Sequence, residues 1–238
     1  MHKIFLVILI CSVGVFADGY PGSIKQIQGT PTLLIHNEPV YASGVRLNIE
    51  WGTVKKFIFQ KDDSIFQQFS ETRTPVMFLG TPGGWCGIDK YNYKYLDSVI
   101  DKLFKDYPKA YLIPSVFLDI TWFSNNFPEE RFCYIEKGKT KQLAYRTTFW
   151  SKRFSIEAKK ALKHLIKHLE SKGYAERILG YQINYGNTAE WNWWDKKKRP
   201  DVSSQAVTAW QNYLKNNYKT IIKTNSIHHK KWKNFKDT

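Results

Sequence analysis

The chain has 238 residues, enough for one large domain or two small ones. Its 42% hydrophobic and 24% charged residues are typical of a globular protein and exclude a low-complexity chain. The formal net charge of +15 favours polyanions or anionic membranes as partners. Because the lysines are spread over helix-like stretches and the tail, a solvated surface is the stronger interpretation, and no nucleic-acid partner is expected.

The N-terminus predicts a secretory signal peptide over residues 1–17. A short basic start, His2-Lys3, precedes an apolar run over residues 4–16, and Val15-Phe16-Ala17 places small residues where a signal peptidase reads. We therefore expect a secreted, extracellular protein whose domain covers residues 18–238. No other segment approaches the roughly 20 apolar residues of a membrane span.

Two cysteines remain beyond the signal peptide, Cys86 and Cys133. An oxidising compartment permits them to form a disulfide, and free thiols are the equal alternative.

After an opening hairpin with its turn at His36-Asn37-Glu38, strands and helices alternate along the chain. The expected strands cover residues 40–47, 75–79, 111–118 and 178–184, and the expected helices cover residues 62–69, 92–106, 151–171 and 203–218. Alternating apolar strands and helices indicate an α/β fold with a parallel sheet covered by helices. No glycine fingerprint of a dinucleotide fold follows the first strand. The pattern favours a (β/α)8 TIM-barrel type with an N-terminal β-hairpin, apparently truncated after about four βα units.

Polar groups stand beside tryptophans wherever an expected strand ends, which is where barrel enzymes carry their active sites. They are Trp85 after the second strand, Asp119 and Trp122 after the third, and Asn187, Glu190 and Trp191 after the fourth. Aromatic rings pack on the C–H faces of sugars, and a carboxyl in an apolar setting has a raised pKa suited to donating a proton. Packing by the tryptophans, a bracing role for Asp119 and a plain surface position for Glu190 are the alternatives.

Two stretches resemble a known group of enzymes. Residues 178–191 (ILGYQINYGNTAEW) resemble the fourth-strand segment of the clan A glycoside hydrolases, nearest to family 42 and related β-galactosidase-like proteins. Residues 115–130 (SVFLDITWFSNNFPEE) resemble their third-strand segment. The resemblance implies that Glu190 is the catalytic acid/base. It also implies substrate-binding residues: Asn187, Gln182 and Asn184 as hydroxyl partners, Asp119 and Trp122 in the non-reducing-end pocket, and Trp85 and Trp191 as platforms.

The chain departs from this family in two ways. Ala189 stands where many members have Asn before the acid/base. The family's nucleophile comes from a strand near the seventh, beyond the four units expected here, and a retaining hydrolase needs both carboxylates. The sequence therefore predicts a glycosidase-like protein that hydrolyses a β-glycoside with retention and is inactive alone unless a second chain or a C-terminal half completes the barrel. The alternative is a non-catalytic carbohydrate-binding remnant.

No cofactor or metal is expected. His164 and His168 have the i,i+4 spacing of a zinc pair, but no acid follows the first histidine, so a solvated helix face is favoured. Carbohydrate is the expected partner.

Overall fold

The structure is a computed structural model, and it describes residues 21–40, 44–48, 70–71, 75–81, 83–118, 121–185 and 201–237. The chain divides into two compact units. The first comprises Met1–Gly80, Ser98–Ser115 and Ile166–Gln182, and the second comprises Thr81–Asp97, Val116–Leu165 and Ile183–Thr238. The expected signal peptide and the expected helix over residues 62–69 lie outside the described residues.

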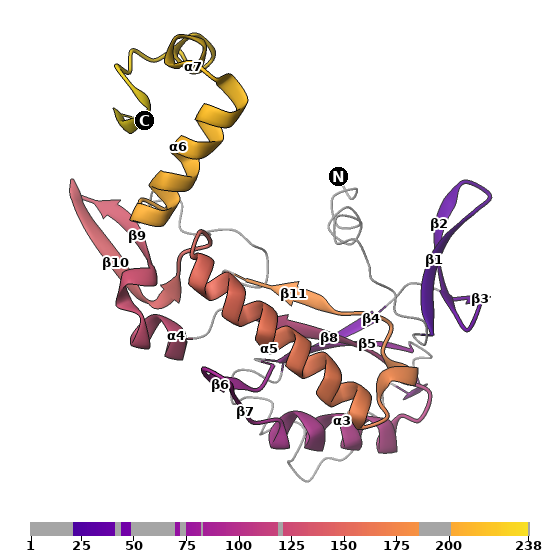
Figure 1. Cartoon of the computed structure of the whole chain (residues 1–238). Helices are drawn as coiled ribbons and strands as arrows, with labels where there is room; N and C mark the ends of the chain where they lie inside the picture. Colours follow the sequence, from indigo (N-terminus) through magenta and orange to yellow (C-terminus); the bar gives the residue numbers. More distant parts are fainter. Residues whose placement is uncertain are drawn as a thin grey trace. The chain divides into compact units, whose positions relative to one another are not determined.

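The central feature is a four-stranded sheet in the order β11-β8-β5-β4 (Figure 1). Its strands are β4 (Gly44–Asn48), β5 (Val76–Thr81), β8 (Tyr111–Phe117) and β11 (Gln182–Asn184). β4 and β5 pair in parallel, and a parallel bridge joins Leu112 to Ile178 just before β11. β5 and β8 are buried along most of their length, as expected for strands covered on both faces. The predicted parallel sheet is confirmed, although β11 is shorter than the strand expected over residues 178–184.

The first unit opens with an antiparallel sheet of β1 (Gly22–Ile27), β2 (Thr30–Ile35) and β3 (Glu38–Pro39). His36 and Asn37 form the turn between β2 and β3 with positive φ angles, so the predicted turn is confirmed. β1 was not expected from the sequence. Ile35 packs with Val76 and Leu179 in a small core, which ties β2 to the main sheet.

Helices α3 (Lys94–Asp106) and α5 (Lys152–Ser171) match the two strongest helical patterns of the sequence. Within the first unit their C-terminal halves are joined by the Tyr174 hydroxyl, which donates to the Asp101 carboxylate at 2.5 Å. Arg177 closes the loop before β8: its guanidinium donates to the carbonyls of Tyr107 and Ala110 and lies 3.6 Å from the Phe104 ring centre. These contacts hold the amino-terminal side of the sheet.

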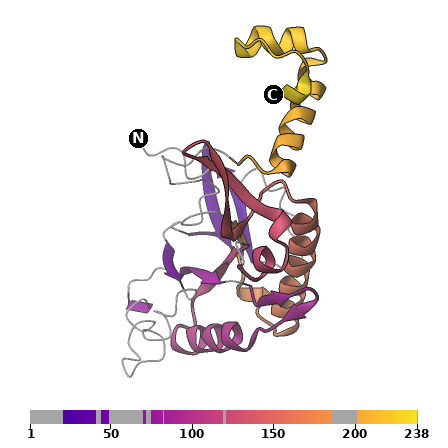
Figure 2. The same ribbon diagram turned by 90° about the vertical axis from the view of Figure 1, so that its left-hand side faces the viewer.

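The second unit contains the elements that follow β5, β8 and β11. They are β6 (Trp85–Gly87), β7 (Lys90–Tyr91), α4 (Thr121–Asn126), η1 (Pro128–Glu130), β9 (Arg131–Glu136), β10 (Lys139–Thr147), α6 (Ser204–Tyr218), α7 (Ile221–His228) and η4 (Phe235–Asp237). β9 and β10 form a hairpin with its own core of Phe132, Tyr134 and Leu143. Figure 2 shows α6 and α7 as two helices joined by a short turn.

The predicted start of α6 is confirmed by its N-cap, because the Ser203 hydroxyl accepts the N–H of Ala206. Thr220 caps α7 in the same way through the N–H of Lys223. Every helix in the described part of the chain is too short or too polar to cross a lipid bilayer.

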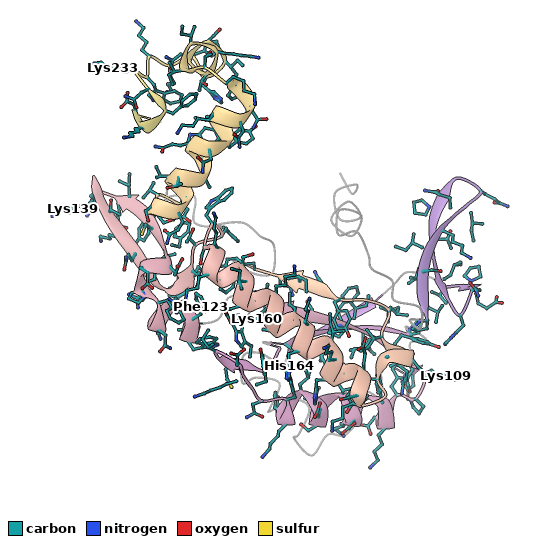
Figure 3. All side chains as sticks on the ribbon, viewed as in Figure 1. Lys109, Phe123, Lys139, Lys160, His164 and Lys233 are labelled. Atoms are coloured by element: carbon teal, nitrogen blue, oxygen red, sulfur yellow. The ribbon has the colours of Figure 1, made fainter. Side chains whose placement is uncertain are left out.

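Both units carry exposed lysines. Lys109, Lys139, Lys160 and Lys233 come from four different elements or loops, and all four are exposed (Figure 3). A dispersed charge of this kind indicates solvated surface.

Candidate functional site

The candidate site is built where β5, β8 and β11 end, and all three ends belong to the second unit. The N–H of Leu118, directly after β8, donates to the carbonyl of Asn184 at the end of β11, with 3.0 Å between the two atoms. The chain segments that follow these two strands therefore start from neighbouring positions. Asp119 follows Leu118, and the segment with Asn187, Glu190 and Trp191 follows Tyr185.

A tight turn leads from β5 into β6. The Thr81 hydroxyl accepts the N–H of Gly83 at 3.1 Å, and Gly84 has a φ of +69°. A Cβ added to Gly84 would lie 2.5 Å from the Tyr93 ring and 2.7 Å from the carbonyl oxygen of Asn92. Both the left-handed backbone and this close approach require glycine, and the turn delivers Trp85 to the end of the sheet.

Trp85 stands in the middle of an aromatic cluster, defined here as Trp85, Trp122, Phe123, Phe154 and Tyr185. Its ring meets that of Trp122 edge-on, with centroids 5.0 Å apart, and lies 6.0 Å from the rings of Phe123 and Phe154. The indole N–H of Trp85 donates to the carbonyl of Gly87, and that of Trp122 donates to the carbonyl of Trp85. The ring contacts and the two indole N–H hydrogen bonds fix the orientation of both tryptophans at the strand ends.

Trp85 and Trp122, both expected to contact the substrate, differ in how much of their surface is exposed. Trp85 is only 4% exposed, so its ring serves chiefly in packing and offers little face to a ligand. Trp122, on α4, is half-buried and keeps more of its surface open. A cavity of about 280 Å³, lined by Gly84, Trp85, Cys86, Asn92, Lys94 and Tyr95, lies beside the β6–β7 hairpin and is at the small end of ligand-pocket sizes.

Gln182 and Asn184, the two residues expected to bind sugar hydroxyls from the fourth strand, both lie on β11. Asn184 is fully buried at the end of the strand. The side-chain carbonyl of Gln182 accepts the Ser115 hydroxyl at 2.9 Å within the first unit, which leaves the Gln182 amide group as its hydrogen-bond donor.

Four expected site residues lie outside the described residues: Asp119, Asn187, Glu190 and Trp191. Their roles remain predictions.

The possible disulfide between Cys86 and Cys133 is not formed, because both cysteines are free thiols. Cys86, on the β6–β7 hairpin, directs its sulfur to the carbonyl of Lys90, while Cys133, on β9, directs its sulfur to the carbonyl of Arg131. The two thiols belong to separate hairpins of the second unit, and of the two alternatives that the sequence left open the structure has the free thiols.

Two exposed aromatic side chains near the strand ends were missed by sequence reasoning. Trp150 is 54% exposed and Tyr145 is 49% exposed. Both flank residues 147–148 at the end of β10, and the carbonyl of Thr147 accepts the hydroxyl of Tyr185, directly after β11. The run Phe149-Trp150 before the long helix was the available signal, but it does not follow any strand that the sequence predicted.

His164 takes part in a stack of rings with the β6–β7 hairpin. Its ring lies 3.9 Å from that of Tyr91 and nearly parallel to it, and its Nδ1 is 2.9 Å from the Tyr93 hydroxyl. The described residues contain no group of three His, Cys, Asp or Glu side chains that could hold a metal ion. The ring contacts with Tyr91 and Tyr93 pack α5 against the hairpin.

Burial of several tyrosines predicts a loss of stability in alkali. Removal from water raises the pKa of Tyr91, Tyr93, Tyr95 and Tyr107 above the ordinary value of 10.0. Above about pH 10 the unfolded chain releases these protons while the folded chain keeps them, so the free energy of unfolding falls as pH rises. Urea unfolding at about pH 8 and about pH 11 should show this fall, and Tyr93→Phe should reduce it. A free energy of unfolding that stays constant over this range would contradict the prediction.

Comparison with solved structures defines the fold class as a TIM-barrel glycosidase type. The chain is similar to the β-galactosidase from the psychrophilic Marinomonas ef1, with 14% identity and a TM-score of 0.53 over 82% of this chain and 29% of that one. It is also similar to the β-galactosidase from the Antarctic haloarchaeon Halorubrum lacusprofundi, with 11% identity and a TM-score of 0.54 over 82% of this chain and 28% of that one.

A third similar structure is the catalytic domain of the β-amylase from Paenibacillus polymyxa, with 12% identity and a TM-score of 0.52 over 82% of this chain and 52% of that one. At such identities the likeness shows the fold alone. The chain spans under a third of the two β-galactosidases and about half of the β-amylase domain.

The family model of the glycoside hydrolase family 42 β-galactosidases matches residues 64–235, and the chain belongs to this family. A search of curated proteins finds no match.

Proposed function

We propose that the chain is a secreted glycosidase that hydrolyses a β-glycoside with retention, with Glu190 as its acid/base. The family match carries this proposal, because it covers the strand ends, the aromatic cluster and the segment that contains Glu190. The position of that segment, after a strand whose end pairs with the end of β8, supports it further. Secretion rests on the signal-peptide pattern of residues 1–17.

In the proposed reaction Glu190 gives its proton to the glycosidic oxygen as the bond from that oxygen to the anomeric carbon breaks. A carboxylate nucleophile forms a bond to the anomeric carbon from the opposite face. Water then attacks that carbon, the bond to the nucleophile breaks, and Glu190 takes up the proton of the water. The family pattern assigns the nucleophile to a later strand, so a second chain or further residues would supply it.

Substrate contacts follow from the same arrangement. We assign Trp122, whose indole keeps part of its surface open, to contact with a sugar face, the Gln182 amide group on β11 to a sugar hydroxyl, and Asp119 to the non-reducing-end pocket. We assign Asn187 and Asn184 to sugar hydroxyls, and Trp191 to stacking on a sugar face.

A second candidate is a carbohydrate-binding protein without hydrolysis. Open aromatic surface in the second unit favours it, because Trp122 is only half-buried and Trp150 is 54% exposed, and such rings can stack on sugars. If a partner chain completes the barrel and supplies the nucleophile, the glycosidase is favoured over the binding protein.

The test is an aryl glycoside panel combined with sugar titration of tryptophan fluorescence, both with the secreted protein. Turnover of an aryl β-galactoside supports the glycosidase. Sugar-dependent quenching without hydrolysis at any pH supports the binding protein. If the protein shows no quenching and no turnover, both candidate functions are rejected.

A further inference from the structure

Tyr185, directly after β11, is anchored as firmly as any side chain in the second unit. It is 1% exposed, and its hydroxyl donates to the carbonyl of Thr147 at 2.5 Å. The ring packs against Phe149, with centroids 4.4 Å apart, and edge-on against Phe154 at 5.6 Å. Tyr185, the last described residue before positions 186–200, is therefore held at the end of β10.

Asp201 is anchored at the other end of the same segment. The buried Thr148 hydroxyl donates to its Oδ2 atom, while its Oδ1 atom accepts the N–H groups of Cys133 at 3.2 Å and Ser203 at 2.9 Å. The Ser203 hydroxyl also lies 3.2 Å from the Thr148 hydroxyl, and the N–H of Val202 donates to the carbonyl of Cys133. A carboxylate that accepts three hydrogen bonds in a half-buried site forms a strong anchor.

Both anchors meet on two adjacent residues. The Thr147 carbonyl accepts the Tyr185 hydroxyl and the Thr148 hydroxyl donates to Asp201, so the residues on either side of positions 186–200 meet at the C-terminal end of β10. Thr148 is itself held through its N–H, which donates to the carbonyl of Glu130. The hairpin thus joins the two ends of one segment of the chain.

We propose that these four residues, Thr147, Thr148, Tyr185 and Asp201, form a stem clamp that positions the segment carrying Glu190. None of the four touches the substrate in this proposal; they are positioning residues. The inference rests on the proposed function, which makes Glu190 the acid/base. Small displacements of a catalytic group lower turnover strongly, so a proton donor on a long segment needs its stem fixed.

The adjacent threonines offer a matched pair of variants. Thr148→Val removes the hydroxyl that bonds Asp201, whereas Thr147→Val keeps the backbone carbonyl that receives Tyr185. The Thr147 hydroxyl is buried and has no hydrogen-bond partner among the described residues, so its removal should leave the clamp intact. The two variants delete the same atom type at neighbouring buried positions.

Limited trypsin digestion of the full chain tests the clamp without any assay of activity, because the rate of cleavage within residues 186–200 reports how firmly this segment is held. Trypsin can cleave inside the segment after Lys196, Lys197 and Lys198. Lys109, before β8, is exposed and distant in sequence from this segment, so cleavage after it serves as the reference. We expect cleavage after residues 196–198 to be about five- to tenfold faster in Thr148→Val and Tyr185→Phe, with cleavage after Lys109 unchanged. Thr148→Ser, which restores a hydroxyl, should return the rate to that of the native chain.

The proposal fails if Thr148→Val leaves this cleavage rate unchanged, or if Thr147→Val accelerates it equally. Equal acceleration at Lys109 would indicate general unfolding and would also overturn it. Tyr185→Phe tests the other anchor if Thr148→Val does not fold.

The separate values of kcat and KM then connect the clamp to catalysis. A displaced proton donor lowers the rate of the chemical step more than it weakens substrate binding, so kcat should fall in Thr148→Val with KM nearly unchanged, and neither should change in Thr147→Val. If digestion supports the clamp while Glu190→Gln leaves turnover unchanged, the clamp stands and the assignment of Glu190 fails. If Glu190→Gln abolishes turnover while digestion does not change, the clamp alone is rejected.

Discussion

Glu190→Gln is expected to lower kcat by about 10²- to 10⁴-fold for a glycoside with a poor leaving group, because an amide has no acidic proton to give to the departing oxygen. The substitution keeps the size of the side chain, so sugar binding measured by tryptophan fluorescence should stay within about twofold. The measurement is initial-rate hydrolysis over a series of leaving groups with the secreted protein, in the presence of any chain needed to complete the barrel.

The leaving-group series makes this result specific to proton donation. An activated aryl leaving group departs without a proton, so the first step should lose far less rate with activated substrates than with an alkyl glycoside. Glu176→Gln is the matched control, since Glu176 is an exposed carboxylate on the short helix η2 (Ala175–Arg177) of the first unit. Equal losses for all leaving groups, or a loss in the control, would contradict the role of acid/base.

The elements that sequence reasoning found are those with strong apolar periodicity. α3 and α5 carry repeated apolar residues on one face, and β5 and β8 are short apolar runs bounded by turn residues, so local pattern and final burial agree. The β9–β10 hairpin escaped because β10 begins with the polar run Lys139–Gln142 and buries few of its side chains. Its strands are stabilised by pairing with each other and by Asp201, contacts that no local pattern reveals.

The candidate site was predictable in position but not in detail. The rule that barrel sites lie at strand ends brought Trp85, Trp122 and Asn184 to the same end of the sheet correctly. The rule could not predict that Trp85 is buried while Trp122 is only half-buried, because the burial of Trp85 depends on Phe123 and Phe154 from other elements. Asp201 was overlooked for the same reason: its partners Thr148 and Cys133 are far away in the sequence.

The second large effect is expected in stability, from Trp85→Ala. The indole is almost completely enclosed by three aromatic side chains, and removing such a ring from a packed core costs about 3–5 kcal/mol in the free energy of unfolding. The carbonyl of Trp85 still accepts the Trp122 N–H after the substitution, so the loss measures the ring and the cavity that it leaves. Urea unfolding followed by circular dichroism gives the value.

Trp150→Ala is the control, because that indole is 54% exposed and its removal should change the free energy of unfolding by no more than about 0.5 kcal/mol. Comparison of the two variants separates the two roles that the sequence allowed for tryptophans at strand ends. A residue that packs loses stability when truncated, whereas a residue that stacks on sugar loses ligand affinity at constant stability. If Trp85→Ala costs no more stability than Trp150→Ala but abolishes sugar-dependent quenching, Trp85 is a binding platform and the aromatic cluster is not the support of the site. The large loss expected here would instead leave Trp122 as the stronger candidate of the two for contact with a sugar face.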